Sequence, residues 1–210
     1  MTIQNFGDRS AKNILIQPVD RRSLNSLEHE AKLIRELTDA DFSLTAVIID
    51  SWNRDLSPWN APAVFGNEPF GDGAKKTLEY ILEICDDKDR SYFLGGYSLA
   101  ALFSLWASCE TDLFRGIAAA SPSVWFPGFI EHIHERNFQT HAVYLSLGDH
   151  ESKTKNPLLA TVSDCIKDTY DTVRSQKITC TLEWNAGNHF KDPDLRCAKA
   201  FAWILNNKEM

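Results

Sequence analysis

Short apolar runs recur along the chain, and each one is bounded by polar residues, Pro or Gly. Runs of this length with β-branched or small side chains are typical of buried β-strands. Six such runs are present, at residues 13–17, 45–50, 91–96, 116–121, 142–147 and 178–184. The last of them alternates apolar and polar residues, which indicates a strand half exposed to water at an edge of the sheet.

Between these runs, apolar residues recur every three or four positions, which is the spacing of amphipathic helices. The first helix is expected after residues 13–17, with Ser23 or Asn25 as its cap. Asn156 and Pro157 have the cap and first-turn chemistry of a helix that we expect to continue to about Arg174. This alternation predicts an α/β fold, with about six mostly parallel strands and helices on both faces of the sheet.

The composition is that of one soluble globular domain, which we expect to span residues 1–210. The net charge of −7 disfavours nucleic acid or an anionic membrane as a partner, because both would repel the chain. Residues 1–8 lack the features of a signal peptide, and no apolar run approaches the ~20 residues of a membrane span. A cytoplasmic location is therefore expected, and a homo-oligomer is compatible with the sequence.

The cysteines favour the same compartment. An odd number of widely spaced cysteines without a Cys-x-x-Cys pair fits free thiols in a reducing environment better than a disulfide framework. The chain has five cysteines, at Cys85, Cys109, Cys165, Cys180 and Cys197.

The stretch from residue 91 to residue 102 carries the clearest chemical signal. Its first half is a buried strand, its second half is built from helix formers, and the turn between them reads Gly96-Tyr97-Ser98-Leu99-Ala100. A strand that becomes a helix within so few residues needs a strained turn with small neighbours, as in the nucleophile elbow Gly-x-Ser-x-Gly. A serine that only caps the helix is the alternative. The strand before it and the helix after it favour Ser98 as a nucleophile.

Two other strand ends carry candidate catalytic side chains. The run at 142–147 leads into Asp149 and Glu151, and the last run leads into His189. A serine needs an imidazole to take its proton, and the imidazole needs a carboxylate to hold its tautomer. The order Ser98, carboxylate, His189 is the triad order of α/β-hydrolases. Both carboxylates follow the same strand, so position alone leaves open which of them is the acid.

An oxyanion hole needs two backbone N–H donors. The elbow supplies one at Leu99, and the loop at Val19 and Asp20 is expected to supply the other. No metal is expected: His150 is flanked by carboxylates, but no spaced set of ligands supports a metal site.

Aromatic residues are frequent in the loops that follow the predicted strands, and they could wall a pocket beside the nucleophile. The alternative is that these rings only pack the loops onto the body of the protein, and that Arg54 only pairs with Asp55. The candidates for the substrate pocket are Tyr97, Arg54, Trp59 and Trp125.

Five segments together carry a family resemblance, at residues 54–59, 96–100, 121–125, 148–151 and 187–190. With them, almost the whole chain resembles the small-esterase branch of the α/β-hydrolase superfamily, which includes esterase D-like, siderophore-esterase-like and antigen 85-like proteins. The resemblance implies a minimal α/β-hydrolase fold without a separate lid domain. It also implies hydrolysis of a small-molecule ester by a Ser–acid–His triad, without a metal or an organic cofactor.

Two features depart from the family pattern. Ala100 replaces the last glycine of the elbow, which is a small-for-small change. The N-terminal segment lacks room for the first two strands of the full eight-stranded sheet, so the edge beside residues 45–50 has no predicted neighbour.

The resemblance favours Glu151 over Asp149 as the acid. In hydrolases of this kind the acid usually stands three residues beyond the glycine that ends the strand, and Gly148 plus three is Glu151. The longer glutamate also reaches a neighbouring loop more readily, whereas Asp149 is better suited to fixing the turn.

The leading hypothesis is a serine hydrolase that cleaves a carboxylic ester through an acyl-enzyme. A thioesterase or an acyl-peptide hydrolase would use the same groups. A non-catalytic binding protein of this fold would be expected to have lost the nucleophile, the acid or the base, and this sequence has candidates for all three.

Overall fold

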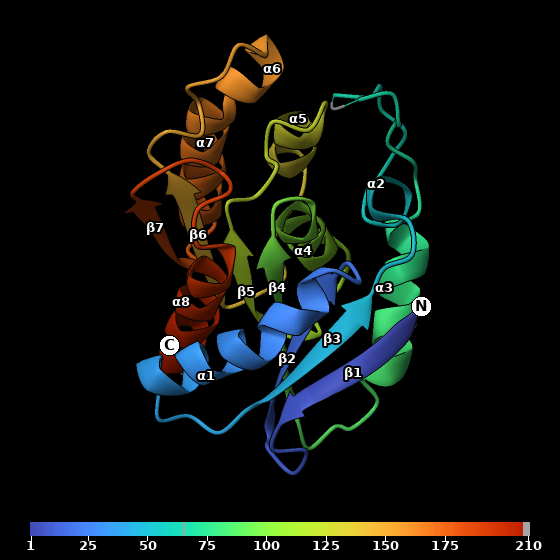
Figure 1. Ribbon diagram of the computed structural model, residues 1–210, viewed down its shortest axis with the longest axis vertical. Helices are drawn as coiled ribbons and strands as arrows, with labels where there is room; N and C mark the ends of the chain where they lie inside the picture. The colour runs from blue at the N-terminus through green and yellow to red at the C-terminus, as the bar shows by residue number, and fades with distance from the viewer. Residues whose placement is uncertain (65, 208–210) are drawn as a thin grey trace.

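The computed structural model describes residues 1–64 and 66–207, and its centre is a seven-stranded sheet (Figure 1). The strand order is β1-β3-β2-β4-β5-β6-β7, in which β1 is antiparallel to its neighbour and the others are parallel. The strands are β1 Thr2–Gly7, β2 Asn13–Val19, β3 Ser43–Ile48, β4 Ser91–Tyr97, β5 Phe114–Ala120, β6 Ala142–Gly148 and β7 Thr179–Asn185. The predicted α/β fold is confirmed.

Helices cover both faces of this sheet. On one face lie α1 (Leu27–Leu37) and α8 (Pro193–Asn206). On the other face lie α3 (Ala74–Ile84), α4 (Leu99–Glu110), α5 (Phe129–His134) and α7 (Val162–Ser175). The central helix α4 is buried along nearly its whole length, because its side chains are small or apolar all round. Short connections contain α2 (Trp52–Asp55), α6 (Pro157–Ala160) and a 3₁₀ turn at Ser23–Ser26.

The strand β1 was not predicted, and it resolves the unexplained edge. It pairs antiparallel with β3 from Thr2 opposite Ile48 to Gly7 opposite Ser43. Its side chains are almost all exposed, so the strand has no buried face and no apolar alternation to reveal it. Backbone hydrogen bonds hold it to the sheet, together with one side-chain hydrogen bond from Thr45 Oγ1 of β3 to Asn5 Oδ1 at 2.7 Å. At the opposite edge lies β7, as predicted from its alternating pattern.

The helix expected from Pro157 to about Arg174 is divided at Thr161 into α6 and α7. Its predicted cap is confirmed, because Asn156 Oδ1 accepts the N–H of Leu158 at 3.0 Å.

The sequence predicts free thiols and no membrane-spanning helix. The five cysteines have free thiols, three of them buried and two, Cys165 and Cys180, half-buried. Within the described residues, no helix combines the length and the apolar character needed to cross a bilayer.

Candidate active site

The turn between β4 and α4 holds Ser98 in a strained backbone conformation, with φ 59° and ψ −118°. The turn is close-packed: a Cβ built on Gly96 would lie 2.8 Å from the Cβ of Ala100. Only glycine fits at position 96. Alanine is accommodated at position 100 because Gly96 carries no side chain. Ser98 therefore stands at the carboxyl end of a central strand and at the N-terminus of α4.

Three predicted side chains meet at this turn. The Oγ of Ser98 lies 3.0 Å from Nε2 of His189, and Nδ1 of the same imidazole lies 2.7 Å from Oε2 of Glu151. His189 comes from the loop after β7 and Glu151 from the loop after β6, so neighbouring strands bring them together. The arrangement can pass the serine proton to the imidazole and hold the resulting charge against the carboxylate.

The second oxygen of Glu151 is fixed by three donors. Its Oε1 accepts hydrogen bonds from the Gly148 N–H at 2.7 Å, from Ser121 Oγ at 2.9 Å and from Arg196 Nη1 at 2.9 Å. Burial raises the pKa of this carboxyl, but the hydrogen bonds and the neighbouring His189 outweigh burial, and the pKa is lowered from its ordinary value. The group is thus held as an oriented carboxylate.

The alternative acid, Asp149, lies elsewhere. Its exposed carboxylate accepts the Gly187 N–H at 2.7 Å, and this hydrogen bond is the main reason why its pKa is lowered. The two loops run so close that a Cβ on Gly148 would lie 2.4 Å from the Gly187 carbonyl oxygen. Of the two candidate carboxylates, the structure places Glu151 against His189, and Asp149 ties together the loops that carry them.

Sequence reasoning missed Arg196 of α8, which is only 2% exposed. Besides Glu151, its guanidinium donates to Tyr97 Oη at 3.1 Å, to Ser121 Oγ at 3.0 Å and to the Asn188 carbonyl at 3.1 Å. The sequence does contain a signal: a charged residue stands among the positions of the last helix that carry its buried apolar side chains. That position indicates a buried charge but does not reveal its partner.

Tyr97 was predicted as a pocket residue and has two roles in the geometry. It lines the cavity beside Ser98, and its hydroxyl donates to the backbone carbonyl of His189 at 2.7 Å. Burial raises the pKa of this phenol to about 12, so it remains a hydrogen-bond donor. Ser123, not singled out as a site residue, has its Oγ 3.2 Å from that of Ser98.

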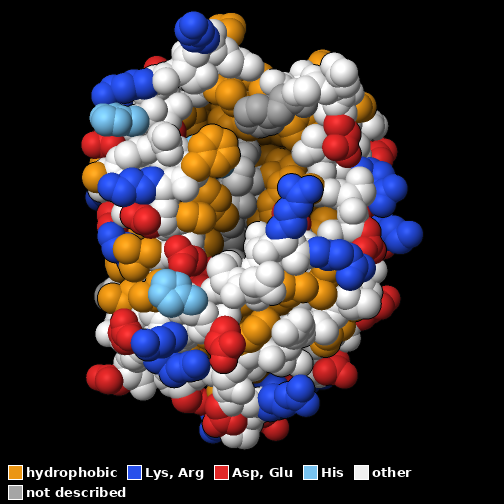
Figure 2. Space-filling model, viewed as in Figure 1, with side chains coloured by type: hydrophobic (Ala, Val, Ile, Leu, Met, Phe, Trp, Pro, Cys, Tyr) orange, Lys and Arg blue, Asp and Glu red, His pale blue; other side chains and the backbone are white. Residues whose placement is uncertain are grey.

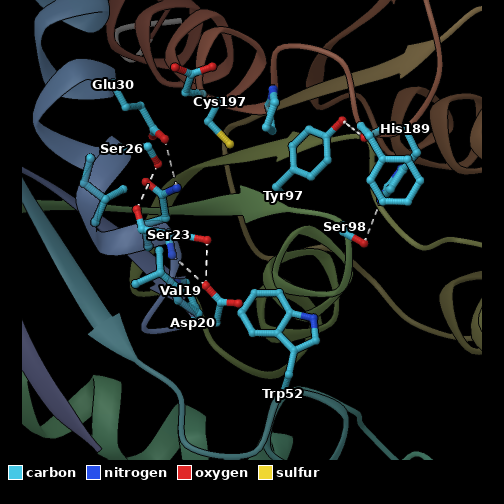
Figure 3. Close-up of a pocket in the computed structure, with 16 residues that line it drawn as sticks. Val19, Asp20, Ser23, Ser26, Glu30, Trp52, Tyr97, Ser98, His189 and Cys197 are labelled. Carbon is cyan, nitrogen blue, oxygen red and sulfur yellow. Dashed lines mark hydrogen bonds between the residues drawn. The ribbon is translucent and has the colours of Figure 1, made fainter. Parts of the chain in front are cut away.

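Two cavities border Ser98, His189 and Phe190. The α1–α8 cavity, of about 390 Å³, extends to α1 and α8 (Figure 3). The α6–α7 cavity, of about 280 Å³, reaches Leu159 and Val162. In the space-filling view the molecule is hollowed near its centre, and hydrophobic side chains gather around the hollow (Figure 2). A molecule bound at Ser98 therefore has room to extend into both cavities.

Other predicted pocket and oxyanion residues divide between these cavities. Trp125 lines the α6–α7 cavity, whereas Val19 and Asp20 line the α1–α8 cavity opposite Tyr97 and Ser98 (Figure 3). Asp20 Oδ1 accepts both the N–H and the hydroxyl of Ser23, which fixes the turn after β2. Leu99 is the first residue of α4, where backbone N–H groups have no partner within the helix.

Two predicted pocket residues, Arg54 and Trp59, are not among the residues that line the two cavities at Ser98. Arg54 pairs with Asp55 at 2.8 Å, which is the alternative left open by the sequence. Trp59 donates its indole N–H to the Pro127 carbonyl at 2.8 Å, so its ring packs one loop against another. Trp52 takes the place expected for an aromatic residue in the α1–α8 cavity.

The described part of the chain contains no group of three or more His, Cys, Asp or Glu side chains arranged to hold a metal ion.

Neither a family model nor a curated protein matches the sequence, but solved structures match the fold. An IroE-like serine hydrolase from Shewanella oneidensis superposes with a TM-score of 0.77 at 13% identity, covering 98% of this chain and 75% of that one. Siderophore hydrolase EstA from Aspergillus nidulans gives 0.69 at 18% identity, with 96% and 85% covered. Est1E from Butyrivibrio proteoclasticus gives 0.64 at 11% identity, with 99% and 94% covered. The seven-stranded sheet and these similarities show that the chain has the α/β-hydrolase fold.

Proposed function

We propose that this protein is a serine hydrolase that cleaves a carboxylic ester, with Ser98 as nucleophile, His189 as base and Glu151 as acid. The observation that carries the proposal is the continuous chain of contacts from Ser98 through His189 to Glu151, at 3.0 and 2.7 Å, on a strained elbow. The fold similarity to structures named as a serine hydrolase and a siderophore hydrolase supports the same reaction class.

In the acylation step, Ser98 Oγ attacks the ester carbonyl carbon while His189 Nε2 accepts the hydroxyl proton. Glu151 stabilises the imidazolium that forms and keeps Nδ1 protonated throughout. The tetrahedral intermediate then expels the alcohol, whose oxygen takes the proton from His189. The product of this step is an ester of Ser98 with the acyl half of the substrate.

In the deacylation step, His189 accepts a proton from water as the water oxygen attacks the acyl carbon. Collapse of the second intermediate breaks the bond to Ser98 Oγ, which recovers the proton, and the carboxylic acid leaves. Each transfer uses protein groups and water, so the proposed reaction needs no cofactor.

We assign the oxyanion hole to the backbone N–H of Leu99 and to the backbone at Val19 and Asp20. The first lies at the start of α4, where the helix dipole favours negative charge. The second lies across the α1–α8 cavity from Ser98. Such donors stabilise the charge that develops on the carbonyl oxygen in the transition state.

A fluorophosphonate probe tests the proposal directly, because it reacts with an activated serine. Wild-type protein should be labelled, and S98A and H189A should not. Turnover of aryl esters, thioesters and acyl peptides would then separate an esterase from a thioesterase or an acyl-peptide hydrolase. A protein that is neither labelled nor active on any of these substrates would be a non-catalytic binding protein, and the proposal would be wrong.

We propose a cytoplasmic location, because five free thiols are typical of a protein in a reducing compartment. The proposed partner is a small-molecule ester, because the cavities at Ser98 are of small-molecule size.

A further inference from the structure

The far end of the α1–α8 cavity is polar, although the proposed reaction uses none of its side chains. In Figure 3, Glu30 enters from the N-terminal half of α1 and Ser26 from the 3₁₀ turn before it, on the opposite side of the cavity from Tyr97 and Ser98. Gln17 enters from β2, and Asp194 from the start of α8. A cavity that served only an apolar group would not have these polar groups in its wall.

Two of these side chains present hydrogen-bond acceptors without partners. Glu30 and Gln17 are 2% and 4% exposed, and Gln17 Nε2 donates to Glu30 Oε2 at 3.3 Å. The other oxygens, Gln17 Oε1 and Glu30 Oε1, have no hydrogen-bond partner. A buried acceptor left unpaired is destabilising, so a group that donates hydrogen bonds to this pair would be stabilised there.

The α1–α8 cavity has the more acidic wall of the two. Its sixteen lining residues include Asp20, Glu30 and Asp194, and no Lys or Arg; its one histidine is His189, the candidate base. In the wall of the α6–α7 cavity, the carboxylate of Glu151 is accompanied by Lys153 and His150. The two halves of a bound ester would therefore meet different electrostatic environments, and a cation is favoured more in the α1–α8 cavity.

We propose that the α1–α8 cavity binds a protonated amine, so that the substrate is an ester with an ammonium group on the half that enters this cavity. The N–H of the ammonium would donate to the unpaired acceptors of Glu30 and Gln17. This inference rests on the proposed hydrolase function and adds the substrate class.

The raised pKa of Glu30 is compatible with a bound ammonium group. Burial raises its pKa to about 8, and the nearby Asp194 contributes in the same direction. The titratable groups that face it come from α8, namely Asp194, which contacts His29 at 2.7 Å, and Cys197. A cation beside this carboxyl stabilises its ionised form, so binding of an ammonium group at neutral pH releases the proton from Glu30.

The test compares esters that differ only in the terminal group. The first series of esters ends in a dimethylammonium group, the second in the isosteric isopropyl group, and the third in a carboxylate. In each series, the terminal group is attached through spacers of increasing length, either on the acyl half or on the alcohol half of the ester. Tertiary amines are chosen because they cannot take the acyl group themselves. For wild-type protein, we expect kcat/KM of the best ammonium ester to exceed that of its isopropyl isostere by about tenfold or more, and the carboxylate to be worst.

The variant E30Q should reduce the ratio of ammonium to isopropyl turnover toward one, because it lowers kcat/KM of the ammonium ester more than that of the isopropyl ester. Glu28 provides the matched control, because it lies on the same helix but is exposed and outside the cavity wall. E28Q should keep the wild-type ratio. If E30Q fails to fold, the wild-type series still decides.

Two failures are distinguishable. Wild-type protein that hydrolyses the isopropyl esters without preferring the ammonium esters overturns the inference alone. Wild-type protein that hydrolyses none of the three series, and is not labelled by the fluorophosphonate, overturns the proposed function as well.

Discussion

Replacing Arg196 by methionine is the sharpest test of how the candidate acid is held. The change keeps an unbranched apolar side chain but removes the charge and all four hydrogen bonds. Glu151, which is 4% exposed at its side chain, would then be a buried carboxylate without its guanidinium partner. We propose that Arg196 acts through Glu151, which makes it a positioning residue.

The expected loss of stability follows from the burial of both partners. Removing one partner of a buried ion pair costs about 3–5 kcal/mol, because the other charge is left uncompensated. For a chain of this length, 1 kcal/mol corresponds to about 2–4 °C in Tm, so R196M should melt about 6–20 °C below wild type. The same loss of orientation should lower kcat.

Thermal unfolding and pH–rate profiles provide the assay. Without the guanidinium, Glu151 attracts the imidazolium of His189 more strongly, so the acid limb of kcat/KM should move to higher pH. A merely structural role would lower Tm and leave this limb in place. R196K, which retains the charge with fewer donors, should fall between R196M and wild type.

The double variant E151Q/R196M completes a thermodynamic cycle. If the two side chains form a coupled pair, it should be less destabilised than the sum of the single variants by about 1–3 kcal/mol. Additive effects, or an R196M protein with wild-type Tm, kcat and pH profile, would refute the assignment of Arg196.

Four further predictions concern the site. S98A should lose about 10⁶-fold in ester turnover, the loss typical of a triad nucleophile, with its CD spectrum unchanged. H189A should be comparably inactive, and wild-type kcat/KM should rise with the deprotonation of one group; a flat profile would contradict the base. E151Q should lower kcat by about 10⁴-fold, whereas D149N should mainly lower Tm; the reverse result would exchange the two carboxylates. Because burial raises the pKa of Glu30 from 4.5 to about 8, the folded state keeps a proton that the unfolded state has lost. Between those pH values stability should therefore fall as pH rises, and urea titrations at about pH 5 and about pH 9 should show a smaller fall for E30Q.

The sequence contains enough periodicity to predict the parallel part of the sheet, but not its antiparallel edge. Strands β2 to β7 carry apolar runs because side chains pack on at least one of their faces. β1 is held to β3 through its backbone, with nearly every side chain in water, so no pattern in residues 2–7 marks it. An edge strand of this kind is defined by the partner that it finds, not by its own composition.

The candidate triad was predictable because its members stand directly after predicted strands, where position in the fold is fixed. The pocket was less predictable, since Arg54 of α2 and Trp59 belong to a long connection whose path depends on its own contacts, such as the pairing of Ala61 with Phe70. Glu30 lies at helical spacing from Leu27 and Ile34, so its burial could have been inferred. Its neighbour Gln17, from β2, could not, because the pairing depends on how α1 packs on the sheet.

Helix α8 connects the two polar systems and also shows how they can be separated. Arg196 contacts Glu151 on the triad side, whereas Asp194 belongs to the wall of the α1–α8 cavity. Arg196 is not among the residues that line this cavity, so R196M should lower kcat for ammonium and isopropyl esters by the same factor. Glu30 has no contact with the triad among its hydrogen bonds, so E30Q should change the ratio between these esters and leave the acid limb of the isopropyl profile in place. If R196M instead changed the ratio, the orientation of Glu151 and the choice of substrate would be coupled through α8, and the two systems would have to be treated as one.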